Sequence, residues 1–259
     1  MARTNGGFRR NFRAAFKLTV MLLWSLWLLP PALITMLLPR RRRILVGVWF
    51  TRLWARGCRH VLGLHVTTFP RDAEKPRGGL IVANHIGYLD VFVYASLFNV
   101  RFAPNIEMKR WPLVGLMTAV NNPVWIDRTR RCHSSDSERE MCEALLGDVP
   151  LLVFPEGTTS EGFSLLPFKS TVFESVLQSG AEIHPIITHY QPPADGTRIP
   201  WVEHSGFLAH LWRTLGLKEI RCEVYIMDTV VPGVCGRKEL ALQLHDTMQN
   251  FLQKVIENA

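Results

Sequence analysis

His85 and Asp90 are two residues whose types and spacing could support catalysis. They flank a turn-forming stretch in which an apolar run breaks at Asn84 and Gly87 follows. Side chains five positions apart on a continuous helix point about 140° away from each other, so these two can meet only if the backbone turns, which Gly87 permits. A carboxylate bonded to Nδ1–H would fix the imidazole tautomer and leave Nε2 to accept a proton near neutral pH. The pair predicts a catalytic dyad; a structural ion pair is the alternative.

The residues around this pair predict the elements that must position it. An apolar strand at 80–83 leads into His85, and a buried helix at 91–98 follows. Further strands are expected at 100–103, 124–126, 150–154, 183–188 and 220–226, and further helices at 137–146, 171–178 and 240–255. Because strands separated by helices form parallel sheets, we expect an α/β fold with a central, mostly parallel sheet flanked by helices. Residues 67–79 are interpreted as the loop that leads into this domain.

Positive charge is concentrated at the beginning of the chain. Residues 1–71 contain 13 Lys and Arg and no acidic residue, whereas the remainder contains 17 Lys and Arg against 22 acidic residues, which gives the net charge of +8. The excess lies beside the most apolar segment, which indicates anionic lipid headgroups as the partner. No nucleic-acid module is evident, so we expect no nucleic-acid partner.

The segment from Leu18 to Leu38 holds 21 residues without a charge. A single helix of that length would reach about 31 Å, roughly the thickness of the bilayer hydrocarbon. Pro30 and Pro31 interrupt it near the centre, and arginines flank both ends. We therefore favour a helical hairpin in one leaflet, whose second arm continues into residues 44–62, over a full span. A cleaved signal peptide fits less well, since four arginines follow the apolar run.

Four sequence blocks follow one another in a recognisable order. After His85-x4-Asp90 come Glu107-x-Lys109-x2-Pro112-x2-Gly115 with Ile126-Asp127-Arg128, then Phe154-Pro155-Glu156-Gly157-Thr158-Thr159-Ser160, and finally Ile183-His184-Pro185-Ile186. The series resembles the glycerolipid acyltransferase family, whose best-known members are the 1-acylglycerol-3-phosphate O-acyltransferases. The resemblance implies a membrane-bound enzyme with its active site at the lipid surface. We accordingly divide the chain into an N-terminal basic segment with membrane-anchoring helices at 1–66 and an acyltransferase domain at 67–259.

The resemblance also implies roles for individual residues. His85 would act as the general base and Asp90 would orient it. The residues expected to bind substrate are Lys109, Arg128, Glu156, Gly157, Thr158 and Lys169. A guanidinium such as that of Arg128 would pair with an anionic headgroup, although a plain surface arginine is the alternative. A solvated turn at Lys109 and an ordinary β-turn at Gly157 are the corresponding alternatives there.

The chemistry expected is acyl transfer without a covalent enzyme intermediate. The sequence has no G-x-S-x-G motif, and its five cysteines are scattered outside any catalytic or zinc-binding pattern. We therefore expect direct attack of the acceptor hydroxyl on a thioester in a ternary complex. Acyl-CoA or acyl carrier protein would be the donor, and neither a cofactor nor a metal is expected.

The acceptor is the least determined part of the prediction. Many phosphatidate-forming relatives have an arginine where this chain has Thr159, and the acidic Glu161 follows two residues later. Lysophosphatidate is the first choice, lyso-ornithine lipid the alternative, and a non-catalytic membrane lipid-binding protein the alternative from another class. If the protein is bacterial, we expect it at the cytoplasmic face of the inner membrane.

Overall fold

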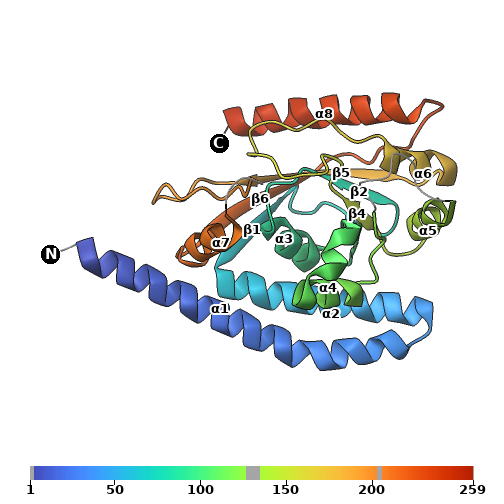
Figure 1. Cartoon of the computed structure of the whole chain (residues 1–259). Helices are drawn as coiled ribbons and strands as arrows, with labels where there is room; N and C mark the ends of the chain where they lie inside the picture. The colour runs from blue at the N-terminus through green and yellow to red at the C-terminus, as the bar shows by residue number, and fades with distance from the viewer. Residues whose placement is uncertain (1–2, 127–134, 203–205, 259) are drawn as a thin grey trace.

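The computed structural model describes residues 3–126, 135–202 and 206–258 (Figure 1). Its six strands form one sheet in the order β1-β6-β5-β2-β4-β3. The strands are β1 Leu64–Phe69, β2 Leu80–Ala83, β3 Arg101–Phe102, β4 Leu151–Val153, β5 Ile183–Tyr190 and β6 Ile220–Ile226. All neighbours are parallel except β5 and β6, which are antiparallel, so the mostly parallel α/β sheet is confirmed.

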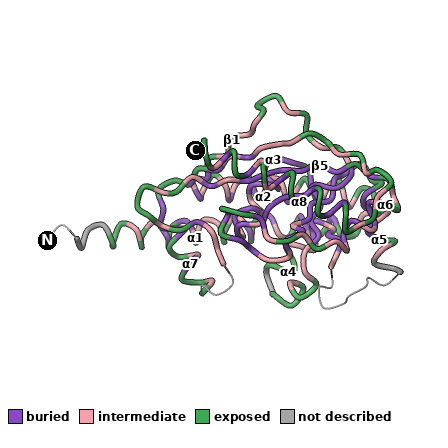
Figure 2. The backbone as a smooth tube through the Cα atoms, turned by 90° about the horizontal axis from the view of Figure 1, so that it is seen from above, coloured by how far each residue is buried: buried purple, intermediate pink, exposed green. Residues whose placement is uncertain are grey.

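Helices cover both faces of the sheet (Figure 1). They are α1 Arg3–Ile34, α2 Arg40–Leu62, α3 Leu89–Leu97, α4 Pro112–Val120, α5 Ser135–Leu145, α6 Thr171–Ser179, α7 Phe207–Leu215 and α8 Arg237–Glu257. Alternate residues of β2 enter two cores: Leu80 packs in the cluster with Leu244 of α8, and Ile81 packs in the cluster with Val93 of α3. Because β2 is buried on both faces, its apolar run is continuous rather than alternating. The buried residues concentrate in the centre of the molecule (Figure 2).

Two strand predictions were wrong. Residues 124–126 form no regular strand, because Ile126 makes only an isolated bridge with Asn105. Conversely, Leu64–Phe69 is a strand, although residues 67–69 were placed in a loop. Their pairing partner, β6, lies more than 150 residues further along the chain, out of reach of local sequence signals. The division between residues 66 and 67 therefore falls inside β1.

Helices α1 and α2 form the two arms of an N-terminal hairpin (Figure 1). The short 3₁₀ helix Thr35–Leu37 joins them. Pro30 and Pro31 lie inside α1, so the turn comes later than the sequence predicted. A proline removes hydrogen bonds locally, and a helix can bend there and continue when a neighbouring helix packs against it. The indole of Trp24 donates to the carbonyl of Trp54 at 3.2 Å, which links the arms.

The hairpin also packs against the rest of the α/β fold. Buried Lys17 donates to the carbonyl oxygens of Leu62 at 2.6 Å and Leu217 at 2.8 Å, which ties α1 to the ends of α2 and α7. The segment Gly7–Leu37 is long and apolar enough, by length and composition, to cross a membrane. In the most apolar window of this segment, only 22% of the residues are buried inside the protein. Most residues of this window are therefore not buried by the described part of the chain.

Candidate active site

The candidate site lies at the carboxyl ends of β2, β4 and β5, where loops from neighbouring parallel strands converge. Asn84, directly after β2, is fully buried and exchanges two hydrogen bonds with the backbone of Thr188 on β5, at 2.9 and 2.8 Å. These bonds fix the end of β2 against its neighbour. His85 therefore leaves the sheet from a defined position.

The loop after β2 brings His85 and Asp90 together. Nδ1 of His85 lies 2.8 Å from Oδ2 of Asp90. The same oxygen accepts the backbone N–H groups of Ile86 at 2.7 Å and Gly87 at 3.0 Å, so the turn closes around the carboxylate. Asp90 lies in the first turn of α3, where the helix dipole favours a negative charge.

The two side chains of the pair have different environments. The Asp90 side chain is 0% exposed, whereas that of His85 is 19% exposed. The His85 ring stacks on Phe154, with centroids 4.0 Å apart and an interplanar angle of 12°. With Nδ1 held by Asp90, Nε2 is the ring nitrogen left to exchange a proton with substrate.

Glu156 holds the backbone of the His85 loop. One carboxylate oxygen accepts the N–H of His85 at 2.8 Å and the other accepts that of Leu166 at 2.8 Å. The carbonyl of His85 in turn accepts the N–H of Ser160 at 2.8 Å. Burial raises the pKa of Glu156, and these backbone bonds oppose that shift. Its assignment to substrate binding stays a prediction, and the geometry gives it a positioning role.

Gly157, Thr158 and Lys169 lie in or against the loop after β4. Gly157 has φ +75°, a conformation that favours glycine. A Cβ at this position would lie 2.6 Å from both Cε and Nζ of Lys169, so the lysine side chain passes directly over the glycine. The backbone of Lys169 also donates to the carbonyl of Pro155 at 2.8 Å. The structure therefore gathers these three predicted residues next to Glu156.

The remaining predicted residues are placed differently. Lys109 lies in the 3₁₀ helix Ile106–Arg110, and its Nζ sits 4.8 Å from the centroid of the Trp125 ring. No contact in the described part of the chain joins it to the dyad. Arg128 lies outside the described residues.

The loop that contains Thr159 and Glu161 has a feature that the sequence motifs did not reveal. Thr159 is 6% exposed. Glu161 pairs with Arg198 at 2.8 Å, so a cation from a distant segment balances its charge. Arg198 thus brings a cation next to Glu161, two residues beyond Thr159.

Sequence reasoning also missed Tyr190. Its hydroxyl donates to Oδ1 of Asp90 at 2.8 Å. A polar side chain at the carboxyl end of a buried strand is a possible signal, but it points to Asp90 only once β5 is known to lie beside β2.

The geometry places a partly exposed histidine ring against a buried carboxylate, as a general base of this kind would require. A family model described as Acyltransferase matches residues 66–189, a segment that includes His85, Asp90 and Glu156. A 1-acyl-sn-glycerol-3-phosphate acyltransferase of Neisseria gonorrhoeae is 30% identical over 184 residues, which cover 71% of this chain and 71% of the relative. The chain belongs to the glycerolipid acyltransferase family.

Other members of this acyltransferase family are similarly related. A lyso-ornithine lipid O-acyltransferase of Rhodobacter capsulatus is 30% identical over 200 residues, covering 74% of this chain and 71% of the relative. The crystal structure of the 1-acyl-sn-glycerophosphate acyltransferase PlsC from Thermotoga maritima matches with a TM-score of 0.68 at 20% identity and covers 98% of both chains. That structural match supports the fold, and the sequence relatives support the family.

Proposed function

We propose that this acyltransferase moves a fatty acyl group from acyl-CoA or acyl carrier protein to the free hydroxyl of 1-acylglycerol-3-phosphate, giving phosphatidate. The observation that carries the proposal is the contact between Nδ1 of His85 and buried Asp90, which directs Nε2 to the substrate. Membership of the glycerolipid acyltransferase family supports the reaction class. The relatives named for lysophosphatidate support the acceptor.

In the proposed reaction His85 removes the proton of the acceptor hydroxyl as its oxygen attacks the thioester carbonyl carbon. The new C–O bond gives a tetrahedral intermediate, from which the C–S bond breaks. The departing thiolate takes the proton back from the His85 imidazolium. The Asp90 carboxylate stabilises that imidazolium and holds its ring in place. The substrate hydroxyl thus occupies the role that serine has in a protease triad.

The exposed face of α1 supports a membrane-bound enzyme. Phe8, Phe12 and Phe16 are spaced four residues apart, share one helix face and are 73%, 66% and 59% exposed. Leu23 and Trp27 extend the exposed apolar surface at 61% and 68%. We place the hairpin in the cytoplasmic leaflet, because its basic residues suit anionic headgroups. Tags placed before Leu18 and after Leu38 should both be protease-accessible from the cytoplasmic side, and opposite accessibility would establish a full span.

Lyso-ornithine lipid is the second candidate acceptor. Buried Thr159 replaces an arginine that could bind phosphate, and relatives named for lyso-ornithine lipid match at similar identity. The ion pair between Arg198 and Glu161 weakens this candidate, since the acidic side chain already has a cationic partner.

The test is kcat/KM for both acceptors, measured by mass spectrometry on purified protein in vesicles with acyl-CoA and with acyl carrier protein as donors. We expect lysophosphatidate to be the better acceptor by at least about tenfold, which corresponds to about 1.4 kcal/mol in transition-state binding. An enzyme that ignores lysophosphatidate and acylates lyso-ornithine lipid would replace the first candidate by the second. Absence of transfer to every lysolipid would overturn the proposal.

A further inference from the structure

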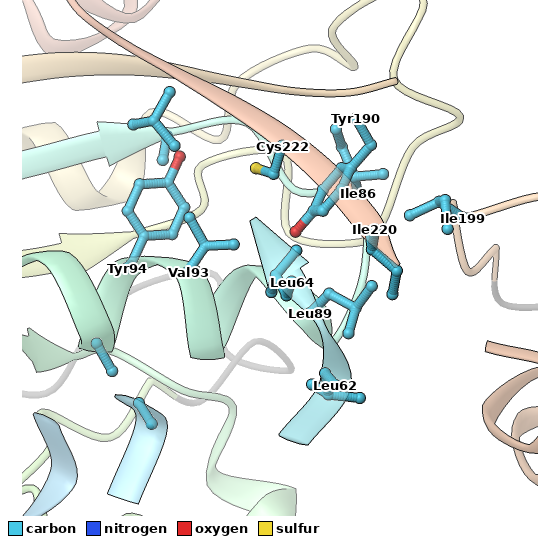
Figure 3. Close-up of a cluster of buried hydrophobic side chains, with 14 of the residues drawn as sticks. Leu62, Leu64, Ile86, Leu89, Val93, Tyr94, Tyr190, Ile199, Ile220 and Cys222 are labelled. Atoms are coloured by element: carbon cyan, nitrogen blue, oxygen red, sulfur yellow. The ribbon is translucent and has the colours of Figure 1, made fainter. Parts of the chain in front are cut away.

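Tyr190, the last residue of β5, reaches the catalytic dyad from the far side of Asp90. Its hydroxyl lies 2.8 Å from Oδ1 of Asp90, and the two residues are 100 positions apart in the chain. Tyr190 is 8% exposed and belongs to the buried cluster that also contains Ile86 and Cys222 (Figure 3). The phenol therefore meets the carboxylate inside the protein, at the oxygen that does not contact His85.

The two oxygens of Asp90 have different numbers of donors. Oδ2 accepts from His85, Ile86 and Gly87, all from its own loop. Oδ1 accepts from Tyr190, its single donor among the described residues. A fully buried carboxylate needs such bonds, because desolvation of its charge is costly. Tyr190 is thus the link that holds the carboxylate to the sheet rather than to its own turn.

We infer that Tyr190 is a positioning residue of the dyad, which orients the Asp90 carboxylate and shares its negative charge, and so sets the orientation and basicity of His85. The inference rests on the proposed role of His85 as general base. The neighbouring strand thereby supplies a third member of the hydrogen-bonded chain that ends at Nε2.

The groups around this contact leave Tyr190 in its donor form. Burial, and next the charge of Asp90, raise the pKa of Tyr190 well above its ordinary value, so the phenol stays protonated. Burial also raises the pKa of the neighbouring Cys222 thiol on β6 and of Tyr94 on α3, which keeps both neutral. Glu156 contributes a carboxyl group whose oxygens are held by backbone amides. In this hydrogen bond the neutral phenol of Tyr190 is therefore the donor and the charged carboxylate of Asp90 is the acceptor.

A purely structural role is the alternative, because any buried tyrosine hydroxyl needs a partner. Tyr94 offers a matched comparison. It is 0% exposed, and its hydroxyl forms a 2.6 Å hydrogen bond with Oγ1 of Thr188 rather than with Asp90. Replacing either residue by phenylalanine removes one buried hydroxyl and one hydrogen bond.

The experiment measures kcat, KM and the pH dependence of kcat/KM for Tyr190→Phe and Tyr94→Phe. Loss of a hydrogen bond to a charged group should lower kcat of Tyr190→Phe by roughly 10- to 100-fold with KM nearly unchanged. With its charge no longer shared, Asp90 should stabilise the imidazolium more strongly and move the acid limb of the profile to higher pH. Tyr94→Phe should show neither change. A Tyr190→Phe enzyme with wild-type kcat and an unmoved acid limb, or equal effects in both variants, would overturn the inference.

A double variant tests whether Tyr190 acts through Asp90. In an Asp90→Asn background, Tyr190→Phe should lower kcat by less than about twofold further, because the two residues act as one unit. Multiplicative losses would contradict the inference. If Tyr190→Phe does not fold, a difluorinated tyrosine at position 190 keeps the ring and hydroxyl but donates more strongly, so the acid limb should move to lower pH, and an unmoved limb would overturn the inference. Full activity of His85→Ala would instead refute the proposed function.

Discussion

At the catalytic edge of the sheet charged side chains are buried, whereas on helix α1 apolar side chains are exposed. Asp90 and Glu156 are 0% and 3% exposed, and every carboxylate oxygen of the two accepts a hydrogen bond. Phe8 and Trp27 on α1 are 73% and 68% exposed, so the described part of the chain leaves most of each side chain uncovered. Burying the carboxylates costs free energy of desolvation, and exposing the apolar side chains of α1 costs free energy of hydration, so each region needs a stabilising interaction.

The difference shows where each penalty is offset. The buried carboxylates are stabilised within the protein, by backbone amides, the His85 ring and one tyrosine, so the fold itself fixes the geometry that we propose for catalysis. The exposed apolar face can be covered only from outside, and a lipid bilayer suits its length, composition and flanking arginines. The proposed catalytic geometry is thus held within the protein, while the proposed membrane location depends on what surrounds α1.

Asp90→Asn should have the largest effect on this contrast. An asparagine amide has one acceptor oxygen, so at least one of the donors around position 90 would lose its partner. We expect kcat to fall by roughly 10³- to 10⁴-fold and the free energy of unfolding to fall by about 1–3 kcal/mol. Asp246→Asn, on α8 with a 61% exposed side chain, is the control and should change neither quantity. More than a tenth of wild-type kcat in Asp90→Asn would break the account of the dyad.

Acidic substitutions on the exposed face of α1 should weaken membrane binding without changing the stability of the fold. Leu23→Glu combined with Trp27→Glu should weaken binding to anionic vesicles at least about tenfold, because both apolar area and charge complementarity are lost. The melting temperature should barely change, since both side chains are exposed. Leu242→Glu on α8, also 61% exposed, is the control and should bind vesicles like wild type. Vesicle sedimentation measures this, and equal binding of all three proteins would argue against α1 as the membrane surface.

Glu156→Gln tests the second buried carboxylate, for which we expect a smaller loss of kcat than for Asp90→Asn. The glutamine offers one carbonyl oxygen where two backbone amides, of His85 and Leu166, need acceptors. We expect the free energy of unfolding to fall by about 1–3 kcal/mol, with kcat lowered roughly tenfold as the His85 loop loosens. Glu161→Gln removes a 52% exposed carboxylate and should change stability by less than about 0.5 kcal/mol. Urea unfolding of the two variants checks this, and equal stability losses would remove the special role of Glu156.

The pH dependence of stability should show the smallest effect. Burial lowers the pKa of the His184 imidazole on β5 below its ordinary value of about 6.5. As the pH falls below that value, the imidazole becomes protonated in the unfolded chain while it stays neutral in the folded protein. Protonation of His184 in the unfolded chain therefore lowers the free energy of unfolding as the pH falls from the ordinary pKa toward the lowered one, and it has no such effect above the ordinary pKa. His184→Gln should lose less stability between pH 7.5 and 5.5 than wild type. His65→Gln, with a 68% exposed side chain, should follow wild type, and parallel curves for all three proteins would refute this prediction.

The sequence predicted what local patterns and short spacings determine. The strand before His85 and the helix after it were predicted from adjacent residues, although the helix begins at Leu89 rather than at residue 91 and so includes Asp90. The turn between the strand and the helix brings His85 and Asp90 into contact, as the spacing predicted. The bond from Tyr190 could not be predicted, because it depends on β5 lying next to β2.

Other errors have the same origin. Leu64–Phe69 becomes a strand only by pairing with β6, and Pro30 remains helical while α1 packs against α2. The ion pair of Arg198 with Glu161 joins loops that no motif connects. Each of these features depends on contacts between residues far apart in the chain, and local patterns in a single sequence do not predict such contacts.

The most direct test of the catalytic account is acyl transfer by His85→Ala in vesicles that contain the preferred lysolipid and radiolabelled acyl-CoA. Circular dichroism should show unchanged folding, because the side chain is partly exposed and its removal leaves the buried carboxylates in place. His65→Ala, on the exposed edge strand β1, is the matched control and should transfer acyl groups like wild type. We predict that kcat of His85→Ala falls by at least about 10³-fold. Residual activity above a tenth of wild type would contradict the assignment of His85 as the general base.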